Sequence, residues 1–172
     1  MHSGLRIVRD LTIDYAAACL EAGASGFFFA TWLANTDLLT RAEYHEFGVP
    51  YDLDVLTALP GRSRIMMLHL CRANLLFDLV AGYPVDVINW AASTSGTSLT
   101  DARRLTNKPL AAGLALETLL RGTEEDVQRE ARQAIVAAGR GLILAPECVI
   151  KGPSPDANLA AARRAAEGTW VT

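Results

Sequence analysis

The sequence predicts an α/β protein built on a parallel β-sheet. Short apolar runs of strand length alternate along the chain with segments whose apolar residues recur at helical spacing. One run contains three consecutive phenylalanines, Phe27–Phe29, which is typical of a strand buried on both faces, as in a parallel sheet. Glycines, prolines and helix-capping residues separate the two kinds of segment. These observations indicate repeated strand–helix units.

The predicted strands are short and apolar, and polar or sulfur-containing side chains follow several of them. The predicted strands cover residues 27–30, 65–70, 85–90, 108–114 and 142–145.

The predicted helices are recognised by their spacing and by their caps. Leu11 and Tyr15 share one helical face with Ala18, Cys19 and Ala22, and we expect Cys19 to pack there. The other helices begin at residues able to cap a helix N-terminus, or end at glycine or proline. The predicted helices are 11–22, a short one capped by Thr40, 52–59 after a break at 48–50, 74–80, one capped by Ser98, a long one of about 16 residues capped by Thr123, and 158–166.

The bulk properties describe one domain, residues 1–172, and exclude several classes of partner. The net charge of −3 and the lack of a basic stripe argue against nucleic-acid binding. No apolar stretch reaches the roughly 18 residues needed to span a bilayer, so we expect no membrane span. Residues 1–10 lack the apolar core of a secretory signal, and the three cysteines do not pair evenly. We therefore expect a reducing, cytoplasmic location.

Reactive side chains follow two of the predicted strands. His69 and Cys71 lie at the end of the run 65–70, and Cys148 follows the run 142–145. Parallel strands end at one edge of a sheet, so the loops after them converge. One imidazole and two thiols could hold Zn²⁺ and leave a fourth position open, which is the catalytic arrangement. The alternative is that these cysteines fill strand ends as small apolar side chains.

Four further residues are candidates for a pocket at the same edge. Glu147, beside Cys148, could be a fourth ligand or could accept a hydrogen bond from the second ring nitrogen of His69. A solvated loop glutamate is the alternative. The alternative for Trp32 and Trp90 is a ring packed in the protein interior, and the alternative for Asn89 is an amide that caps a neighbouring element. The four residues are Trp32, Asn89, Trp90 and Glu147.

The strand-end motifs also occur in a characteristic order. They are His69-Leu70-Cys71, residues 86–90 (DVINW), 109–114 (PLAAGL), 122–127 (GTEEDV) and 141–148 (GLILAPEC), preceded by 28–32 (FFATW) and 46–51 (EFGVPY) and followed by Asn158-Leu159. In this order and spacing they resemble the C-terminal part of the uroporphyrinogen decarboxylase superfamily, and the resemblance covers nearly the whole chain.

The resemblance implies a fold and a set of ligands. The fold is a TIM-type (β/α)8 barrel, of which this chain would supply about the last five strands and lack the N-terminal part. The superfamily includes zinc methyltransferases that move a methyl group from a corrinoid protein to a thiol such as coenzyme M. Their ligands resemble a His-x-Cys pair and a later Cys, which fall here on His69, Cys71 and Cys148. One departure is Arg72, where the family often has Gly; its cation either crowds the site or stabilises thiolate.

Three functions are therefore expected in order. The first is a zinc-dependent methyltransferase-like enzyme with a small-molecule substrate and a corrinoid protein as partner. The second is a metal-free decarboxylase of porphyrin and heme biosynthesis, for which Arg72 and Arg103 are the few candidate arginines. The third is an inactive or ligand-binding partial barrel. An open sheet has two edges that invite pairing, so either a second copy completes the barrel, or another chain does, or the sequence is a fragment of a longer barrel. Of these we expect a homo-oligomer or completion by another chain.

Overall fold

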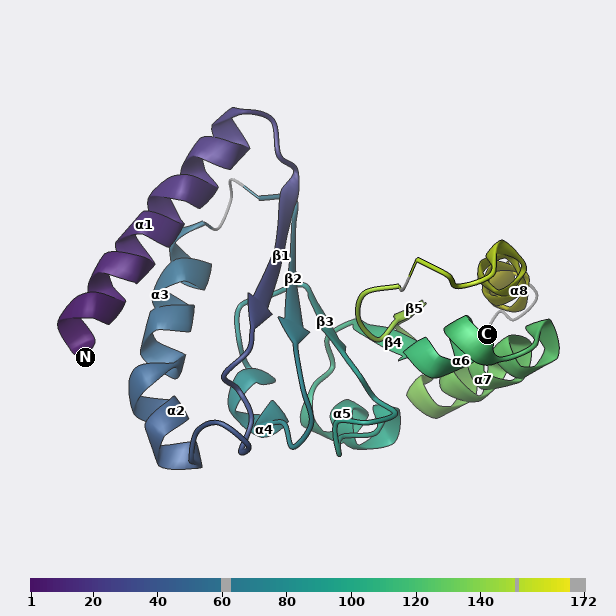
Figure 1. The fold of residues 1–172 in the computed structure, drawn as a ribbon. Coiled ribbons are helices and arrows are strands. Elements are labelled where there is room, and N and C mark those ends of the chain that lie inside the picture. The colour runs from purple at the N-terminus through teal and green to yellow at the C-terminus, as the bar shows by residue number, and fades with distance from the viewer. Residues whose placement is uncertain (60–62, 151, 168–172) are drawn as a thin grey trace.

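The computed structural model describes residues 1–59, 63–150 and 152–167, in which helices and strands alternate (Figure 1). The predicted α/β class is confirmed. The elements in order are α1 (His2–Glu21), β1 (Gly26–Thr31), α2 (Arg41–Phe47), α3 (Val49–Ala58), β2 (Ile65–Leu70), α4 (Phe77–Val80), β3 (Val87–Trp90), α5 (Leu99–Leu105), β4 (Leu110–Leu114), α6 (Leu116–Arg121), α7 (Glu124–Ala138), β5 (Leu142–Pro146) and α8 (Asp156–Glu167).

All five strands are parallel and lie in the order β1-β2-β3-β4-β5. Each strand therefore pairs with the next one along the chain, which is the order of consecutive strands in a barrel wall. Figure 1 shows α1 and α3 beside β1 at one end of the sheet and α6 to α8 beside β5 at the other. The carboxyl ends of the strands share one edge, as the sequence predicts.

The two faces of the sheet differ sharply in burial. One face packs against the helices, and there Leu68, Ile88 and Leu110 are fully buried. The other face, which we call the open face, carries Phe28, Ile65, His69, Asn89 and Ile143 in register. Its apolar side chains remain in contact with solvent, because no described element covers them.

Phe28 corrects one prediction. The Phe27–Phe29 run was expected to be buried on both faces, but the side chain of Phe28 is 58% exposed. Phe27 and Phe29 point the other way and pack against the core. The run is apolar on both faces because it belongs to the wall of a barrel, and the described residues leave its open face uncovered.

The first helix differs from its prediction in start and orientation. It begins at His2 instead of residue 11. Leu11 and Tyr15 are 64% and 73% exposed, whereas Ala16 is buried. The helix carries apolar residues on more than one side, so spacing alone did not select the face. Contact between α1 and α3 decides it.

Other boundaries shift for identifiable reasons. The helix α3 begins at Val49 instead of residue 52, because Pro50 lies in its first turn, where no N–H is needed. The helix α4 is confined to Phe77–Val80, since the residues before it form the loop after β2. The strands β3 and β4 each begin two residues later than predicted, at Val87 and Leu110. The short helix α6 was not predicted.

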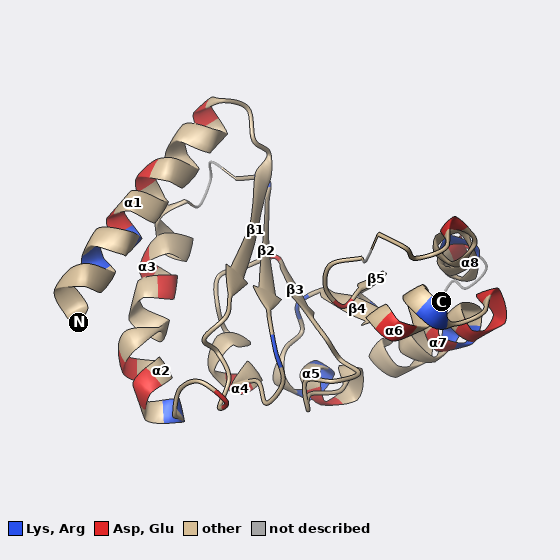
Figure 2. Ribbon diagram, in the orientation of Figure 1, with Lys and Arg blue, Asp and Glu red and all other residues tan. Residues whose placement is uncertain are grey.

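The predicted caps are confirmed. Thr40 and Thr123 each form a capping box with the residue three positions later, and the Ser98 hydroxyl accepts the N–H of Asp101. Figure 2 shows that most charged residues lie on the helices, while the strands are largely free of them. No helix in the described part of the chain is long and apolar enough to cross a bilayer.

Candidate metal centre

Three side chains from two distant strands meet at the carboxyl edge of the sheet. His69 is the penultimate residue of β2 and points to the open face, and Cys71 follows the strand directly. Cys148 lies two residues beyond the end of β5. In a flat sheet β2 and β5 would be about 14 Å apart. Because the sheet curls as a barrel wall does, the three ligand atoms all lie within 4.8 Å of one another.

The spacing of these atoms suits a tetrahedral zinc ion. Nε2 of His69 lies 3.0 Å from Sγ of Cys71 and 3.7 Å from Sγ of Cys148. Ordinary Zn–N and Zn–S bonds would place a nitrogen and a sulfur ligand about 3.6 Å apart. One imidazole and two thiols are also a donor set that zinc prefers. The residues present therefore fit Zn²⁺, with three ligands supplied by the chain.

His69 is buried and held on both sides. Its side chain is 4% exposed, and its ring stacks on Phe28 with the ring centroids 5.0 Å apart. Its Nδ1 donates to Oδ1 of Asn89 over 2.6 Å. Burial lowers the pKa of His69, although the hydrogen bond to Asn89 opposes this. The imidazole is thus favoured in its neutral form, which is the form that binds a metal.

Cys148 and Arg72 both influence the thiol of Cys71. Burial and the neighbouring Cys148 raise the pKa of Cys71, while the charge of Arg72 lowers it. Arg72 adopts a positive φ of 81°, which is uncommon for a side chain other than glycine. Its guanidinium lies over the ring of Trp32, 5.1 Å from the ring centroid. Arg72 is therefore turned toward Trp32.

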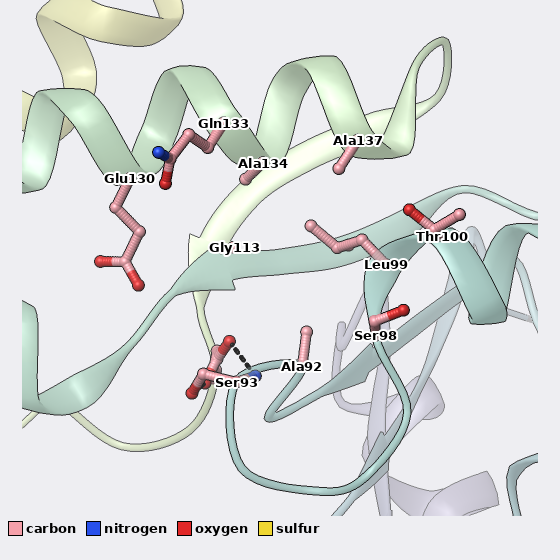
Figure 3. Close-up of a pocket in the computed structure, with 11 residues that line it drawn as sticks. Ala92, Ser93, Ser98, Leu99, Thr100, Gly113, Glu130, Gln133, Ala134 and Ala137 are labelled. Atoms are coloured by element: carbon pink, nitrogen blue, oxygen red, sulfur yellow. Dashed lines mark hydrogen bonds between the residues drawn. The ribbon is translucent and has the colours of Figure 1, made fainter.

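Glu147 was expected beside the metal ligands or on His69, but its carboxylate is bound by Ser93 instead. Its buried carboxylate accepts hydrogen bonds from the backbone N–H and the hydroxyl of Ser93. It lines a cavity of about 250 Å³ that includes Glu130 of α7 (Figure 3). Burial, with the charge of Glu130, raises the pKa of Glu147. Asn89, and not Glu147, is the partner of His69.

The two tryptophans proposed to line a pocket, Trp90 and Trp32, lie in different environments. Trp90 is fully buried, packs edge-on against Phe77 and donates its indole N–H to the carbonyl of Thr97, so it belongs to the core and not to a pocket. It alternates with Asn89, which puts the ring on the helix side of the sheet. Trp32 is 58% exposed beside Arg72.

Two contacts were missed in the sequence. Phe28 stacks on His69, and Ser93 holds Glu147. The period-two alternation of β1 and β2 places Phe28 and His69 on one face, but strand register is needed to make them neighbours. Nothing in the sequence singles out Ser93.

The fold and the ligand cluster define a class of protein: a partial (β/α) barrel with candidate metal ligands at the carboxyl ends of its strands. A sequence model of the family "Uroporphyrinogen decarboxylase (URO-D)" matches residues 1–168. The chain belongs to the uroporphyrinogen decarboxylase family.

Two curated relatives carry different names. The chain is 31% identical over 133 residues to a uroporphyrinogen decarboxylase of Syntrophotalea carbinolica, covering 74% of this chain and 36% of the relative. It is 27% identical over 151 residues to the methylcobamide:CoM methyltransferase MtbA of Methanosarcina acetivorans, covering 87% of this chain and 44% of the relative. The chain thus spans less than half the length of either relative.

Two solved structures share the fold. A methyltransferase from Methanosarcina mazei matches with a TM-score of 0.82 at 22% identity, covering 95% of this chain and 48% of that one. A B12-independent methionine synthase from Shewanella sp. W3-18-1 matches with a TM-score of 0.71 at 14% identity, covering 93% and 52%. The prediction of a partial TIM-type barrel is confirmed.

Proposed function

We propose that the chain is the zinc-binding part of a methyltransferase that moves a methyl group from a corrinoid carrier to a small-molecule thiol. The observation that carries this proposal is the convergence of His69, Cys71 and Cys148. The similarity to a methylcobamide:CoM methyltransferase supports the reaction class. When bound, Zn²⁺ supplies a Lewis acid that lowers the pKa of a coordinated thiol.

The chain's own residues prepare the site. His69 presents Nε2 toward the two sulfurs, and Phe28 covers one face of its ring. If His69, Cys71 and Cys148 held Zn²⁺, a fourth position would be open to the substrate sulfur. In the transfer the thiol loses its proton to solvent, sulfur forms a bond to the methyl carbon, and the methyl–cobalt bond breaks with its electron pair left on cobalt.

We further propose that a second polypeptide or a second copy completes the barrel. The chain, as one domain, matches 48% of the methyltransferase structure, and its open face exposes Phe28, Ile65 and Ile143. We keep the expectation of a cytoplasmic, reducing location, because the cysteines are free and two thiolates must stay reduced to hold a metal.

A decarboxylase of porphyrin biosynthesis is the second candidate, favoured by the 31% identity to a uroporphyrinogen decarboxylase. Its anionic substrate would require arginines at the strand ends. Arg103 donates to the backbone carbonyls of Lys108 and Ala138, which ties it to the helix side of the sheet. Arg72 is then the remaining candidate of the two. The third alternative, an inactive or ligand-binding partial barrel, predicts neither metal uptake nor turnover.

The test combines metal content with turnover. Protein purified without an affinity tag is analysed for zinc beside Cys148→Ser and, as a matched control, Cys19→Ser, since Cys19 lies on α1 outside the ligand cluster. We expect about one zinc per chain in the wild type and the control, and a loss in Cys148→Ser. Demethylation of methylcobalamin by added thiols should be retained in the wild type and in Cys19→Ser and lost in Cys148→Ser. Absence of zinc uptake overturns the proposal, and tetrapyrrole binding without zinc would favour the decarboxylase.

A further inference from the structure

Asn89 joins three strands through one buried side chain. It lies in β3, between β2 and β4, and is 4% exposed. Its Oδ1 accepts the hydrogen bond from Nδ1 of His69 in β2. Its Nδ2 donates to the carbonyl of Ala111 in β4 over 2.5 Å and to that of Pro146 in β5 over 3.3 Å. Every polar atom of the side chain is used.

These contacts leave Asn89 one orientation. Two backbone carbonyls accept hydrogen bonds and donate none, so the NH₂ end of the amide must face Ala111 and Pro146. The oxygen end must then face His69, where it requires a proton on Nδ1. The lone pair of the imidazole is left on Nε2, the atom directed at the two sulfurs.

The same side chain also holds the segment that carries the third ligand. Pro146 is the last residue of β5, and Cys148 follows two residues later. The hydrogen bond from Asn89 to the Pro146 carbonyl fixes the end of this strand relative to β3. His69 lies in β2 and Cys148 lies just beyond β5, and these two strands do not pair with each other. Asn89 contacts both strands and so holds the two residues relative to each other.

We infer, on the basis of the zinc site proposed above, that Asn89 is a positioning residue: it fixes the metal-binding tautomer of His69 and aligns it with the segment that carries Cys148. A metal-ligating histidine gains about 10–100-fold in metal affinity from a partner on its other ring nitrogen. Here one amide acts on two ligands at once.

The chain offers a matched control for the loss of a buried asparagine. Asn158 is 3% exposed, and its Nδ2 donates to the carbonyls of Leu119 and Gly122 over 3.0 and 2.8 Å. It lies outside the ligand cluster. Asn89→Leu and Asn158→Leu each remove two such bonds, so both should lower stability, but Asn89→Leu alone should weaken zinc binding, by about 10–100-fold. Competition against a chromophoric chelator measures this affinity.

Asn89→Asp separates positioning from packing. Its carboxylate still accepts the Nδ1 proton of His69, while its other oxygen faces two carbonyls with no donor. We expect its stability to fall as in Asn89→Leu. Its zinc affinity should fall less than that of Asn89→Leu, because the hydrogen bond to His69 is kept while the one to the Pro146 carbonyl is lost. An Asn89→Leu protein that binds zinc as tightly as wild type, or an equal loss in Asn158→Leu, overturns the inference.

A measurement without metal keeps this inference distinct from the proposed function. Long-range ¹H–¹⁵N NMR of the metal-free protein, at mildly alkaline pH, reports which ring nitrogen of His69 carries the proton. We expect Nδ1–H in the wild type and in Asn158→Leu, and a tautomer mixture in Asn89→Leu. Wild-type protein that takes up no zinc overturns the proposed function; a tautomer unaffected by Asn89→Leu overturns the role of Asn89.

Discussion

Sγ of Cys148 lies 3.7 Å from Nε2 of His69, although 79 positions of sequence separate the two residues. Their strands are not neighbours, since β3 and β4 lie between them. The contact exists because the sheet curls. Metal binding at this point would therefore join β2 to the segment that follows β5.

The first prediction concerns metal removal. Zinc that binds only the folded protein stabilises it by about 2.7 kcal/mol at a free concentration 100 times its dissociation constant. We expect a strong chelator to lower the melting temperature of the wild type and of Cys19→Ser. Cys148→Ser, which lacks one ligand of the cluster, should melt at the same temperature with and without chelator. Differential scanning fluorimetry checks this, and a wild type indifferent to chelator would contradict it.

The second prediction concerns association through the open face. Phe28 and Ile143 lie on this face and are 58% and 44% exposed, and exposed apolar patches mark association sites. We expect gel filtration with light scattering to show a self-associated wild type. Phe28→Lys should shift it toward monomer, because a charge on the contact surface is costly to desolvate.

Val136→Lys is the control for this prediction, since Val136 is 78% exposed on α7, away from the open face. It should leave association unchanged. A wild type that remains a monomer at all concentrations would contradict self-association. Completion of the barrel by a different chain would then be the form of the proposal left to test.

The third prediction concerns pH and Asp52. Its carboxylate accepts hydrogen bonds from the hydroxyls of Tyr44 and Tyr83 over 2.6 and 3.1 Å. Burial raises the pKa of Asp52 in the fold, although these two hydrogen bonds oppose it. A raised pKa contributes stability that is complete below the unfolded value and is lost as pH rises through the folded value.

The wild type should therefore gain stability relative to Asp52→Asn as pH falls from about 7 toward about 4, near the unfolded pKa of aspartate. Urea unfolding at several pH values measures the difference. Asp14→Asn, an exposed position on α1, is the control for removing one carboxylate charge. A difference for Asp52→Asn that moves the opposite way would contradict the raised pKa.

The fourth prediction concerns Gly113 in β4. Its φ is +100°, and an added Cβ would lie 2.5 Å from Cβ of Ala134 in α7. Gly113→Ala therefore combines a disfavoured backbone with overpacking, and overpacking alone costs about 1–3 kcal/mol. Gly82→Ala is the control, because an added Cβ there meets nothing within 4 Å. Chemical denaturation compares the two, and equal losses would contradict the tight packing of α7 on β4.

The sequence by itself determined the alternation of strands and helices, the parallel sheet, the capped helix starts and the positions of His69, Cys71 and Cys148 at strand ends. These follow from local periodicity, from cap chemistry and from the rule that parallel strands end at one edge. It also determined the family: the strand-end motifs between residues 28 and 159 occur in the family's order, and the sequence model of the family matches residues 1–168.

Only the tertiary structure decided which faces and which partners these residues have. The packed side of α1 depends on α3, and the exposure of Phe28 depends on the absence of a covering element among the described residues. The sequence suggested Glu147, which precedes Cys148, as a hydrogen-bond partner of His69. The partner is Asn89, because the register of β2 and β3 places Asn89 opposite His69. Local sequence specifies the strands, but the curl and register of the sheet determine which side chains meet across it.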